Sequence, residues 1–376
     1  MKSCAHSLYH TARKIFQSPA LALSFQALLL LFLRADGRSL PAHSRLKSGG
    51  ALSRFLNTYS WGTRALIRVY RHQVLKVFNQ LAQQRRGSKP RVELIVDLTS
   101  MDKEGKFKDL TGWIHGLNKH HGLHLVMLYI CVGDFKFPWS FRIWKGKGSK
   151  SVTQLALDLV RTVPKTLTQN RDVWVLADGG FDAADFIRGV HLHGFVCIVG
   201  TRKNRKTCVD KAVVTKTKPI SSYAQRTRVI YLPAVTENGQ AIPMYFSWVW
   251  LERNGGWEKR YVLSTLDLSP RNLALAGKRR WKIEGFFKTV KHRFGLHRFA
   301  QGTKQGVLRY ILLSLFAYLI SHLRGLRLNL ARAAKDLPEW GKLAEDVALE
   351  LMPNLILELH DQERQRLEQR IKALQL

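Results

Sequence analysis

Apolar residues recur at helical spacing along residues 269–295 and form one stripe that should face a core. Ser269 suits the N-cap of such a helix, Pro270 suits its first turn, and Gly295 suits its end. The stripe consists of Ile283, Phe286, Phe287, Val290 and Phe294. The pattern therefore predicts one long amphipathic helix over this stretch.

Two other stretches show apolar runs that end in a carboxylate, as buried central strands do. VELIVDLTSMD places Asp97 after such a run, and DVWVLADGGFD places Asp178 before a Gly-Gly turn. Further strand candidates are HLVMLYICVGDF, SFRIWKG and FVCIVGTR, and residues 151–162 and AADFIRGVHLHG read as helices. Strands followed by an alternation of helices and strands predict an α/β core with a mixed sheet.

A β-rich insertion is predicted at about residues 208–268, between Asp178 and the helix that carries Glu284. Its first part is basic and rich in threonine. YFSWVWLER and RYVLSTLDLS then resemble an antiparallel pair of strands.

The two ends of the chain read as helical. Residues 1–88 are predicted to form a helical N-terminal region, residues 89–325 the α/β domain and residues 326–376 a C-terminal helical region. Residues 83–90 are polar and have the composition of a linker. Residues 52–56 and 63–82 could form a helix-turn-helix unit or pack only as structural helices.

Helices are also expected after Gly295, at about residues 304–323, 329–335, 340–350 and 355–373. The last of these could make a dimer contact or pack on its own domain. The apolar runs at residues 21–33 and 310–323 are expected to be core helices. The second is shorter than the roughly 20 residues of a membrane span, and no membrane partner is expected.

Charge narrows the function. The chain has 61 Lys and Arg against 27 Asp and Glu, a formal charge of +34. The excess lies before residue 339, spread over sequence that should fold, which indicates a nucleic-acid partner. No phosphate-binding glycine loop is present, so nucleotide hydrolysis has no support. The four cysteines are widely separated, as in a reduced cytoplasmic protein.

Few acids remain in so basic a chain, and these are candidate ligands for hard cations such as Mg²⁺. Position favours Asp97 and Asp178, together with Glu284 on the amphipathic helix. Glu284 could alternatively make only ordinary helix ion pairs with Arg280 and Lys288. Competing acids are Asp102, Asp134, Asp182 and Asp267. A zinc site among His115, His120, His121 and His124 has little support from their spacing.

The segment R280-W-K-I-E284-G-F-F-K288-T-V-K291 resembles the C-terminal signature of bacterial insertion-sequence transposases of the DDE class. That signature runs Tyr, two residues, Arg, three residues, Glu, six residues, Lys. Arg280, Glu284 and Lys291 match it, whereas Gly277 stands at the tyrosine position. The likeness covers roughly residues 91–325.

The resemblance implies an RNase H-like catalytic domain at residues 89–325, in which Asp97, Asp178 and Glu284 hold two Mg²⁺ or Mn²⁺ ions. It also implies that the helical region at residues 1–88 binds the DNA ends. It implies cleavage of double-stranded DNA at the terminal inverted repeats of an element, strand transfer to target DNA through a 3′-hydroxyl, and a homodimeric synaptic complex. DNA phosphates would contact Arg280, Lys288 and Lys291. The expected location is the bacterial cytoplasm, at the nucleoid.

In some relatives a tryptophan of the β-insertion stabilises a flipped base. Trp248, Trp250 and Trp257 are the candidates here, although for each of them a packing role in the sheet is the favoured interpretation. Two other functions stay open: an RNase H-like host nuclease, and a non-catalytic DNA-binding protein descended from a transposase.

Overall fold

The computed structural model describes residues 4–34, 39–84, 91–103, 108–210, 217–226, 229–253, 255–332 and 339–374. Most of the predicted linker at residues 83–90 lies outside them. The chain divides into two compact units. One comprises Met1–Val77, Lys106–Thr111 and Phe287–Leu376, and the other comprises Phe78–Gly105 and Gly112–Phe286.

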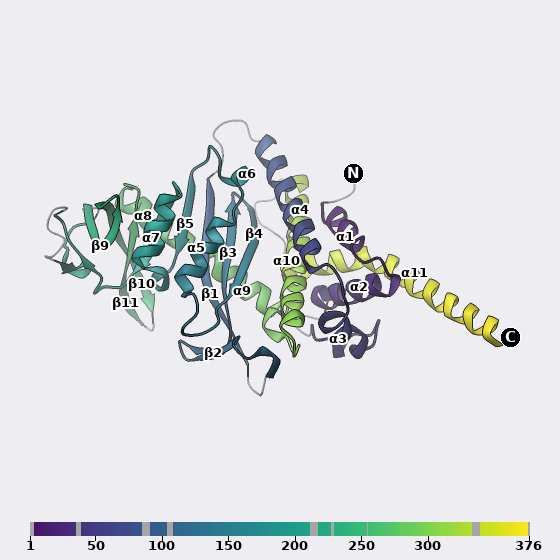
Figure 1. The fold of residues 1–376 in the computed structure, drawn as a ribbon. Helices are drawn as coiled ribbons and strands as arrows, with labels where there is room; N and C mark the ends of the chain where they lie inside the picture. Colours follow the sequence, from purple (N-terminus) through teal and green to yellow (C-terminus); the bar gives the residue numbers. More distant parts are fainter. Residues whose placement is uncertain are drawn as a thin grey trace. The chain divides into compact units, whose positions relative to one another are not determined.

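A nine-stranded mixed sheet forms the core of the second unit (Figure 1). Its strands are β1 (Val92–Asp102), β2 (Ile114–Leu117), β3 (His120–Val132), β4 (Phe135–Ile143), β5 (Val173–Ala177), β6 (Val196–Thr201), β9 (Val229–Glu237), β10 (Gln240–Arg253) and β11 (Gly256–Ser264). The order is β2-β3-β1-β5-β6-β11-β10-β9, and β4 pairs with β3. Strands β1, β5 and β6 run parallel, and the other pairs named are antiparallel.

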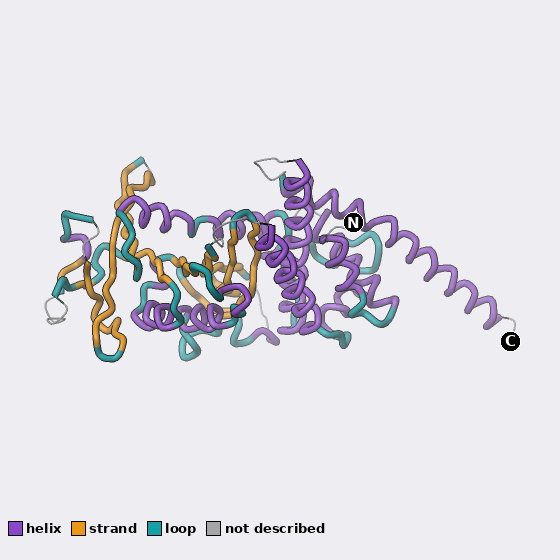
Figure 2. The backbone as a smooth tube through the Cα atoms, turned by 90° about the horizontal axis from the view of Figure 1, so that it is seen from above, coloured by secondary structure: helices purple, strands orange, loops and turns teal. Residues whose placement is uncertain are grey.

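Helices lie on both faces of this sheet (Figure 2). Helix α5 (Val152–Arg161) and helix α7 (Ala184–Leu192) pack on one face, and α5 begins with a capping box at Ser151. Helix α8 (Pro270–Arg279) packs on the other face, against β10 and β11. The short helix α6 (Lys165–Thr168) and a small pair of strands, β7 (Lys206–Thr207) and β8 (Lys218–Pro219), complete the unit.

The mixed α/β fold predicted from the sequence is confirmed. The region predicted as a β-rich insertion contains β9, β10 and β11. These strands continue the central sheet, because β11 pairs antiparallel with β6.

The single helix expected over residues 269–295 is wrong. Helix α8 ends at Arg279, and a second helix, α9 (Lys282–His292), begins after a break at Arg280 and Trp281. Backbone N–H groups of Trp281, Ile283 and Glu284 bond to carbonyls three residues earlier, so the chain tightens into 3₁₀-type turns here. The predicted N-cap is present, since the Ser269 hydroxyl accepts from the Asn272 N–H at 3.3 Å. The apolar stripe is buried throughout.

Helices dominate the other unit. They are α1 (Cys4–Arg13), α2 (Pro19–Arg34), α3 (Gly49–Asn57), α4 (Thr63–Gln84), which begins there, α10 (Lys304–Arg332) and α11 (Trp340–Leu374). Helix α10 contacts α1, α2, α3 and α11. Its segment Lys304–Leu326 is long and apolar enough to cross a membrane. However, 94% of its apolar stretch is buried inside the protein, as in a core helix.

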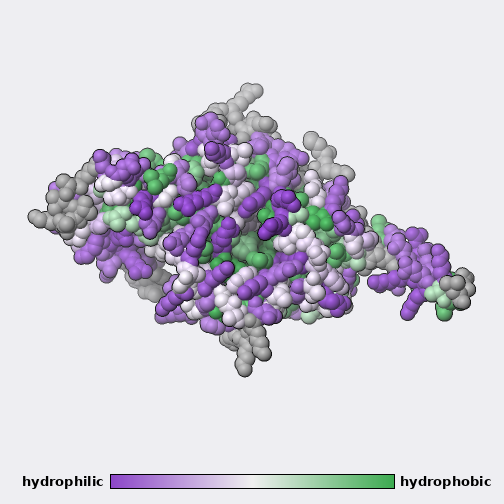
Figure 3. All heavy atoms as spheres, viewed as in Figure 1, coloured by the Kyte–Doolittle hydropathy of each residue, from purple (hydrophilic) through white to green (hydrophobic). Residues whose placement is uncertain are grey.

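Two boundaries expected in the C-terminal part are wrong. Helix α10 was expected to end near residue 323, but it continues to Arg332 and includes the start of the helix expected at 329–335. A single glycine, Gly325, is tolerated inside it. Residues 333–335 lie outside the described residues. Helix α11 is continuous and includes Pro353. Its last turns are mostly hydrophilic on the face drawn in Figure 3. They also carry three exposed apolar side chains, those of Leu367, Ile371 and Leu374.

Arg309 of α10 is 2% exposed and joins α10 to the turn between α3 and α4. Its guanidinium donates to five oxygens at 2.9–3.2 Å: the carbonyls of Phe55, Leu56, Tyr59 and Trp61 and the hydroxyl of Thr63. It also lies 4.1 Å from the centre of the Trp61 ring. Burial lowers the pKa of Arg309 to about 10, so the side chain stays charged at neutral pH. Backbone carbonyls thus stabilise a buried cation.

Replacing Arg309 by methionine should lower the free energy of unfolding by about 3 kcal/mol, because several buried carbonyls lose their donor. Urea denaturation followed by circular dichroism measures this. Arg364→Met is the matched control: Arg364 is exposed on α11, and its loss should change stability by less than about 0.5 kcal/mol. Equal stability of the two variants would contradict the role given to Arg309.

Candidate active site

Two of the predicted site residues lie side by side where the parallel pairing of two interior strands, β1 and β5, stops. Strand β1 itself continues to Asp102, so Asp97 lies within this strand and not at its end as the sequence predicted, because β1 stays paired with β3 beyond it. Strands β1 and β5 are parallel neighbours, and Val96 pairs with Ala177. Asp97 and Asp178 are the next residues along each chain, so both carboxylates lie at the carboxyl end of this strand pair. The parallel register therefore brings together two acids that are 81 positions apart.

Local hydrogen bonds orient both aspartates. The Asp97 carboxylate is nearly buried and accepts from the backbone N–H of Leu98 at 2.8 Å. Asp178 caps the 3₁₀ turn Gly179–Phe181, because its Oδ1 accepts from the Gly180 N–H at 2.9 Å. This hydrogen bond holds the Asp178 side chain over the start of the turn.

Glu284 lies in the first turn of α9, and Arg280 connects it to β1. The Arg280 guanidinium donates through Nη1 to Oδ2 of Asp97 at 3.1 Å and through Nη2 to Oε1 of Glu284 at 2.8 Å. Glu284 is the more accessible acid, with 56% of its side chain exposed against 11% for Asp97. One guanidinium therefore bridges a buried and an exposed carboxylate.

The electrostatics of Asp97 reflect these neighbours. Burial is the main cause that raises the pKa of Asp97 to about 7, and the negative charge of Asp178 is the next. Arg280 and the Leu98 N–H lower the pKa, while Glu284 raises it further. Asp97 thus interacts with both other acids, and Arg280 offsets part of the repulsion.

The described part of the chain contains no set of three His, Cys, Asp or Glu side chains grouped closely enough to hold a metal ion. The donors nevertheless suit Mg²⁺ or Mn²⁺, because all three are carboxylates and the environment of Asp97 disfavours its negative charge. Arg280 already places a cation between Asp97 and Glu284. Asp97, Asp178 and Glu284 are the residues that would hold the ions.

The competing acids lie in other settings. Asp102 is exposed and pairs with His120 at 2.9 Å. Asp182 accepts through Oδ2 from the Thr201 hydroxyl, and its Oδ1 lies 3.7 Å from Nε of Arg205. Asp134 and Asp267 are exposed and follow β3 and β11, which run antiparallel to β1 and β6 and so end at the opposite edge.

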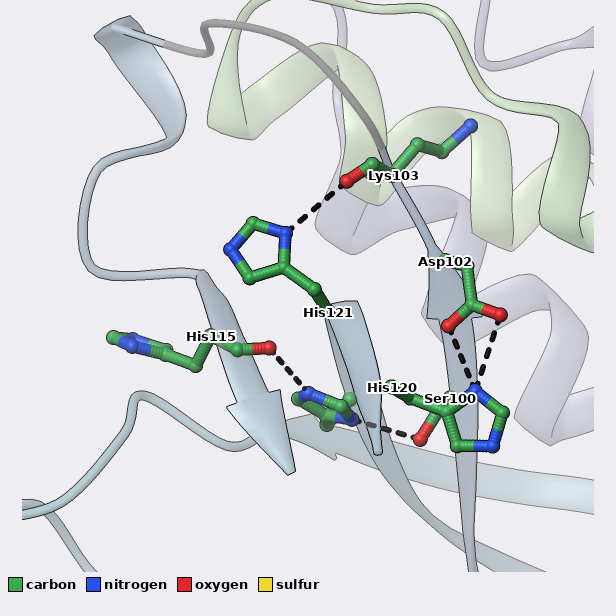
Figure 4. Close-up of polar contacts among 7 residues, drawn as sticks. Ser100, Asp102, Lys103, His115, His120 and His121 are labelled. Carbon is green, nitrogen blue, oxygen red and sulfur yellow. Dashed lines mark hydrogen bonds and ion pairs between the residues drawn. The ribbon is translucent and has the colours of Figure 1, made fainter. Parts of the chain in front are cut away.

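The histidines near the end of β1 make separate hydrogen bonds (Figure 4). His124 bonds through Nδ1 to Ser100 at 2.8 Å and through Nε2 to the His115 carbonyl at 2.7 Å. His121 Nδ1 lies 3.3 Å from the Lys103 carbonyl. The rings thus connect strand ends.

Gly277 lies where α8 packs closely on β11. A Cβ atom at this position would lie 2.8 Å from Cγ2 of Val262, which is a stiff β-branched side chain. A tyrosine therefore does not fit here without moving the helix, which gives a physical reason for the departure from the transposase signature.

Two basic residues of the signature follow Glu284 on α9. Lys288 is exposed and Lys291 is partly exposed, one and two helical turns further on.

Three further charged residues near the site were not predicted from the sequence: Glu93, Arg279 and Lys282. Glu93 of β1 is 6% exposed and pairs with Arg279 at 3.0 Å and Lys282 at 2.6 Å. The only sequence signal was a glutamate inside the apolar run of β1, since a buried strand residue of this type needs a partner.

A mixed sheet flanked by helices, with acids at the ends of neighbouring parallel strands and a third on a following helix, is the architecture of the RNase H-like phosphodiester-transfer enzymes. Residues 88–320 match the family described as the Transposase DDE domain, and the chain belongs to this family. It is a DNA transposase of the DDE class, and such enzymes catalyse phosphodiester cleavage and strand transfer.

Similar folds are found among solved structures, and one of these is a transposase complex. It is a piggyBac transposase synaptic complex with hairpin DNA, which matches at a TM-score of 0.52 and 11% sequence identity. The match covers 93% of this chain and 73% of that chain. No curated protein matches the sequence.

The raised pKa of Asp97 gives a pH-dependent prediction. Its pKa is about 7 in the folded protein and near 4 when unfolded, so the folded state binds the proton more tightly. The contribution of Asp97 to the free energy of unfolding therefore falls as pH rises from about 4 to about 7 and is constant above. Asp97→Asn should remove this contribution, so the variant should gain stability relative to the unsubstituted protein over that range.

Urea denaturation in the presence of a chelator, at intervals from pH 5 to pH 8, measures the difference. Asp134→Asn removes an exposed acid and should give a difference that does not change with pH. A pH-independent difference for Asp97→Asn as well would contradict the assignment.

Proposed function

We propose that Asp97, Asp178 and Glu284 are the catalytic acids of this transposase, and that together they hold two Mg²⁺ or Mn²⁺ ions. The bridge from Asp97 through Arg280 to Glu284 carries this proposal, together with the electrostatic interaction of Asp97 with Asp178. The proposed substrate is double-stranded DNA at the terminal inverted repeats of an insertion sequence, and the exposed 3′-hydroxyl then attacks target DNA.

The acids would divide the work according to their burial. Asp97 and Asp178 are fixed by backbone hydrogen bonds where the pairing of β1 with β5 stops, and they would form the rigid side of the site. Glu284 is exposed and would face the DNA. When bound, the ions supply Lewis acidity that favours attack of one oxygen on phosphorus and departure of another. Arg280 would then orient a phosphate, since its planar guanidinium suits bidentate contacts.

Other features support further parts of the proposal. The charge of +34 suits long contacts with DNA, and the described structure of α3 and α4 allows a helix-turn-helix role for residues 52–82 in binding the element end. Exposed Leu367, Ile371 and Leu374 on α11 support a homodimer. We also propose that the protein belongs to a bacterial insertion-sequence subgroup, with Gly277 in place of the tyrosine, and that it acts in the bacterial cytoplasm.

Separate substitution of Asp97, Asp178 and Glu284 by alanine should each lower the rate of strand cleavage on the order of 10³-fold or more, the scale expected for an essential catalytic group. DNA binding should persist, because the basic surface is intact. The measurements are cleavage of labelled DNA taken from the sequence flanking the gene, in Mg²⁺ or Mn²⁺, and gel-shift binding.

Asp134→Ala is the control and should cleave at the normal rate. Unchanged cleavage in any of the three variants would remove that residue from the site. Binding of the flanking DNA without cleavage in the unsubstituted protein would favour a non-catalytic DNA-binding function, and cleavage without preference for the flanking repeats would favour a host nuclease.

Lys288→Ala and Lys291→Ala should weaken binding to DNA of any sequence. Each should also reduce the slope of log K against log salt by about 1, because one phosphate contact is lost. Binding measured by fluorescence anisotropy at several salt concentrations tests this. Lys372→Ala, on the exposed end of α11, is the control and should leave the slope unchanged. An unchanged slope for both α9 variants would place the DNA elsewhere.

A further inference from the structure

Glu93 is a buried charged residue in the middle of the central sheet. It lies on β1 between Cys131 of β3 and Trp174 of β5 and is 6% exposed. It precedes Asp97 by four residues, and side chains four apart on a strand point to the same face. Glu93 and Asp97 therefore face the same elements, Glu93 from the start of β1 and Asp97 from its middle.

Those elements are the end of α8 and the start of α9. Glu93 accepts from Arg279 through Oε1 at 3.0 Å and from Lys282 through Oε2 at 2.6 Å. Arg279 is the last residue of α8, and Lys282 is the first residue of α9. One carboxylate thus holds both sides of the break at Arg280 and Trp281.

The same break places Arg280, which reaches Asp97 and Glu284. Two acids on one face of β1 therefore bind three cations on successive parts of a short turn. A buried carboxylate is costly unless it is paired, so the arrangement that satisfies both oxygens of Glu93 is strongly preferred over others. The hydrophobic pattern alone favours a straight helix across this break, which would rotate Glu284 about the helix axis relative to Asp97.

A ring contact supports the same placement. The Arg279 guanidinium lies 5.9 Å from the centre of the Trp174 ring, and Trp174 pairs directly with Glu93 across the strands. Arg91 covers the same ring at 3.5 Å. Arg279 therefore has both a charged and an aromatic partner on the sheet.

We propose that Glu93 is a positioning residue for the third catalytic acid: it fixes the break between α8 and α9 and so sets the position of Glu284 relative to Asp97. This inference rests on the proposed function. Glu93 itself touches neither substrate nor ion. Its effect reaches the site through Arg279, Lys282 and the turn that they anchor.

Glu93→Gln tests the proposal, because it keeps the shape of the side chain and removes the charge that holds two cations. The readouts are Mn²⁺ affinity, from the free-ion signal in electron paramagnetic resonance, and strand cleavage as a function of Mg²⁺ concentration. Mn²⁺ affinity should fall roughly 10- to 100-fold, as for loss of a group that orients a metal ligand. Cleavage should recover toward the normal rate at high Mg²⁺.

Two controls separate positioning from simple loss of stability. Glu258→Gln removes another strand carboxylate with an arginine partner, Arg260 at 2.7 Å, and should leave Mn²⁺ affinity unchanged. Arg309→Met destabilises the protein away from the site and should also leave Mn²⁺ affinity unchanged at temperatures where it is folded. If Glu93→Gln does not fold, Lys282→Gln removes only one of the two pairs and should give a smaller fall in affinity.

Normal Mn²⁺ affinity in folded Glu93→Gln, or in Lys282→Gln where it replaces that variant, overturns the inference. Glu284→Ala separates a failure of the positioning role of Glu93 from a failure of the proposed catalytic site. If Glu284→Ala loses Mn²⁺ affinity while Glu93→Gln does not, the positioning role fails and the proposed catalytic site stands. If Glu284→Ala binds Mn²⁺ normally, the proposed site itself fails.

Discussion

Attraction between acids on β1 and cations at the end of α8 and start of α9 is the interaction on which the candidate site depends. Neither partner would be stable alone: Glu93 and Asp97 are nearly buried, and the cations cluster on one short turn. Together they offset each other and fix a helix against a strand almost two hundred residues away in sequence. The geometry of the site is therefore set mainly by charge, within a frame set by apolar packing.

The frame itself could be predicted from the sequence. The apolar runs before Asp97 and Asp178 predicted the two strands, and parallel pairing in an α/β core explains why these two acids lie next to each other. The predicted end of the first strand is wrong, because β1 continues past Asp97 to Asp102. The stripe from Ile283 to Phe294 correctly showed which face of the helix is buried. These signals are strong because burial repeats along the chain with a regular period.

The break at Arg280 and Trp281 could not be predicted in the same way. Neither residue is a helix breaker, and the hydrophobic period continues across them. The acids that pair with this turn lie on a strand far away in the sequence, so no local signal marks the break. Glu93 was visible only as a glutamate inside an apolar run, and its partners could not be identified from that. The continuity of α11 through Pro353 also runs against local propensity. The assignment of catalytic roles to Asp97, Asp178 and Glu284 stays a prediction, supported by the contacts around them.

Arg309 has a consequence for how the protein is made. The carbonyls that accept from Arg309 belong to residues 55–61. During translation these residues leave the ribosome about 250 residues before Arg309 does. The helical unit is also built from both ends of the chain. Its N-terminal helices therefore cannot reach their final packing during most of synthesis, and a nascent or truncated chain lacks the completed unit. This unit can therefore complete its fold only after the α/β unit has been translated.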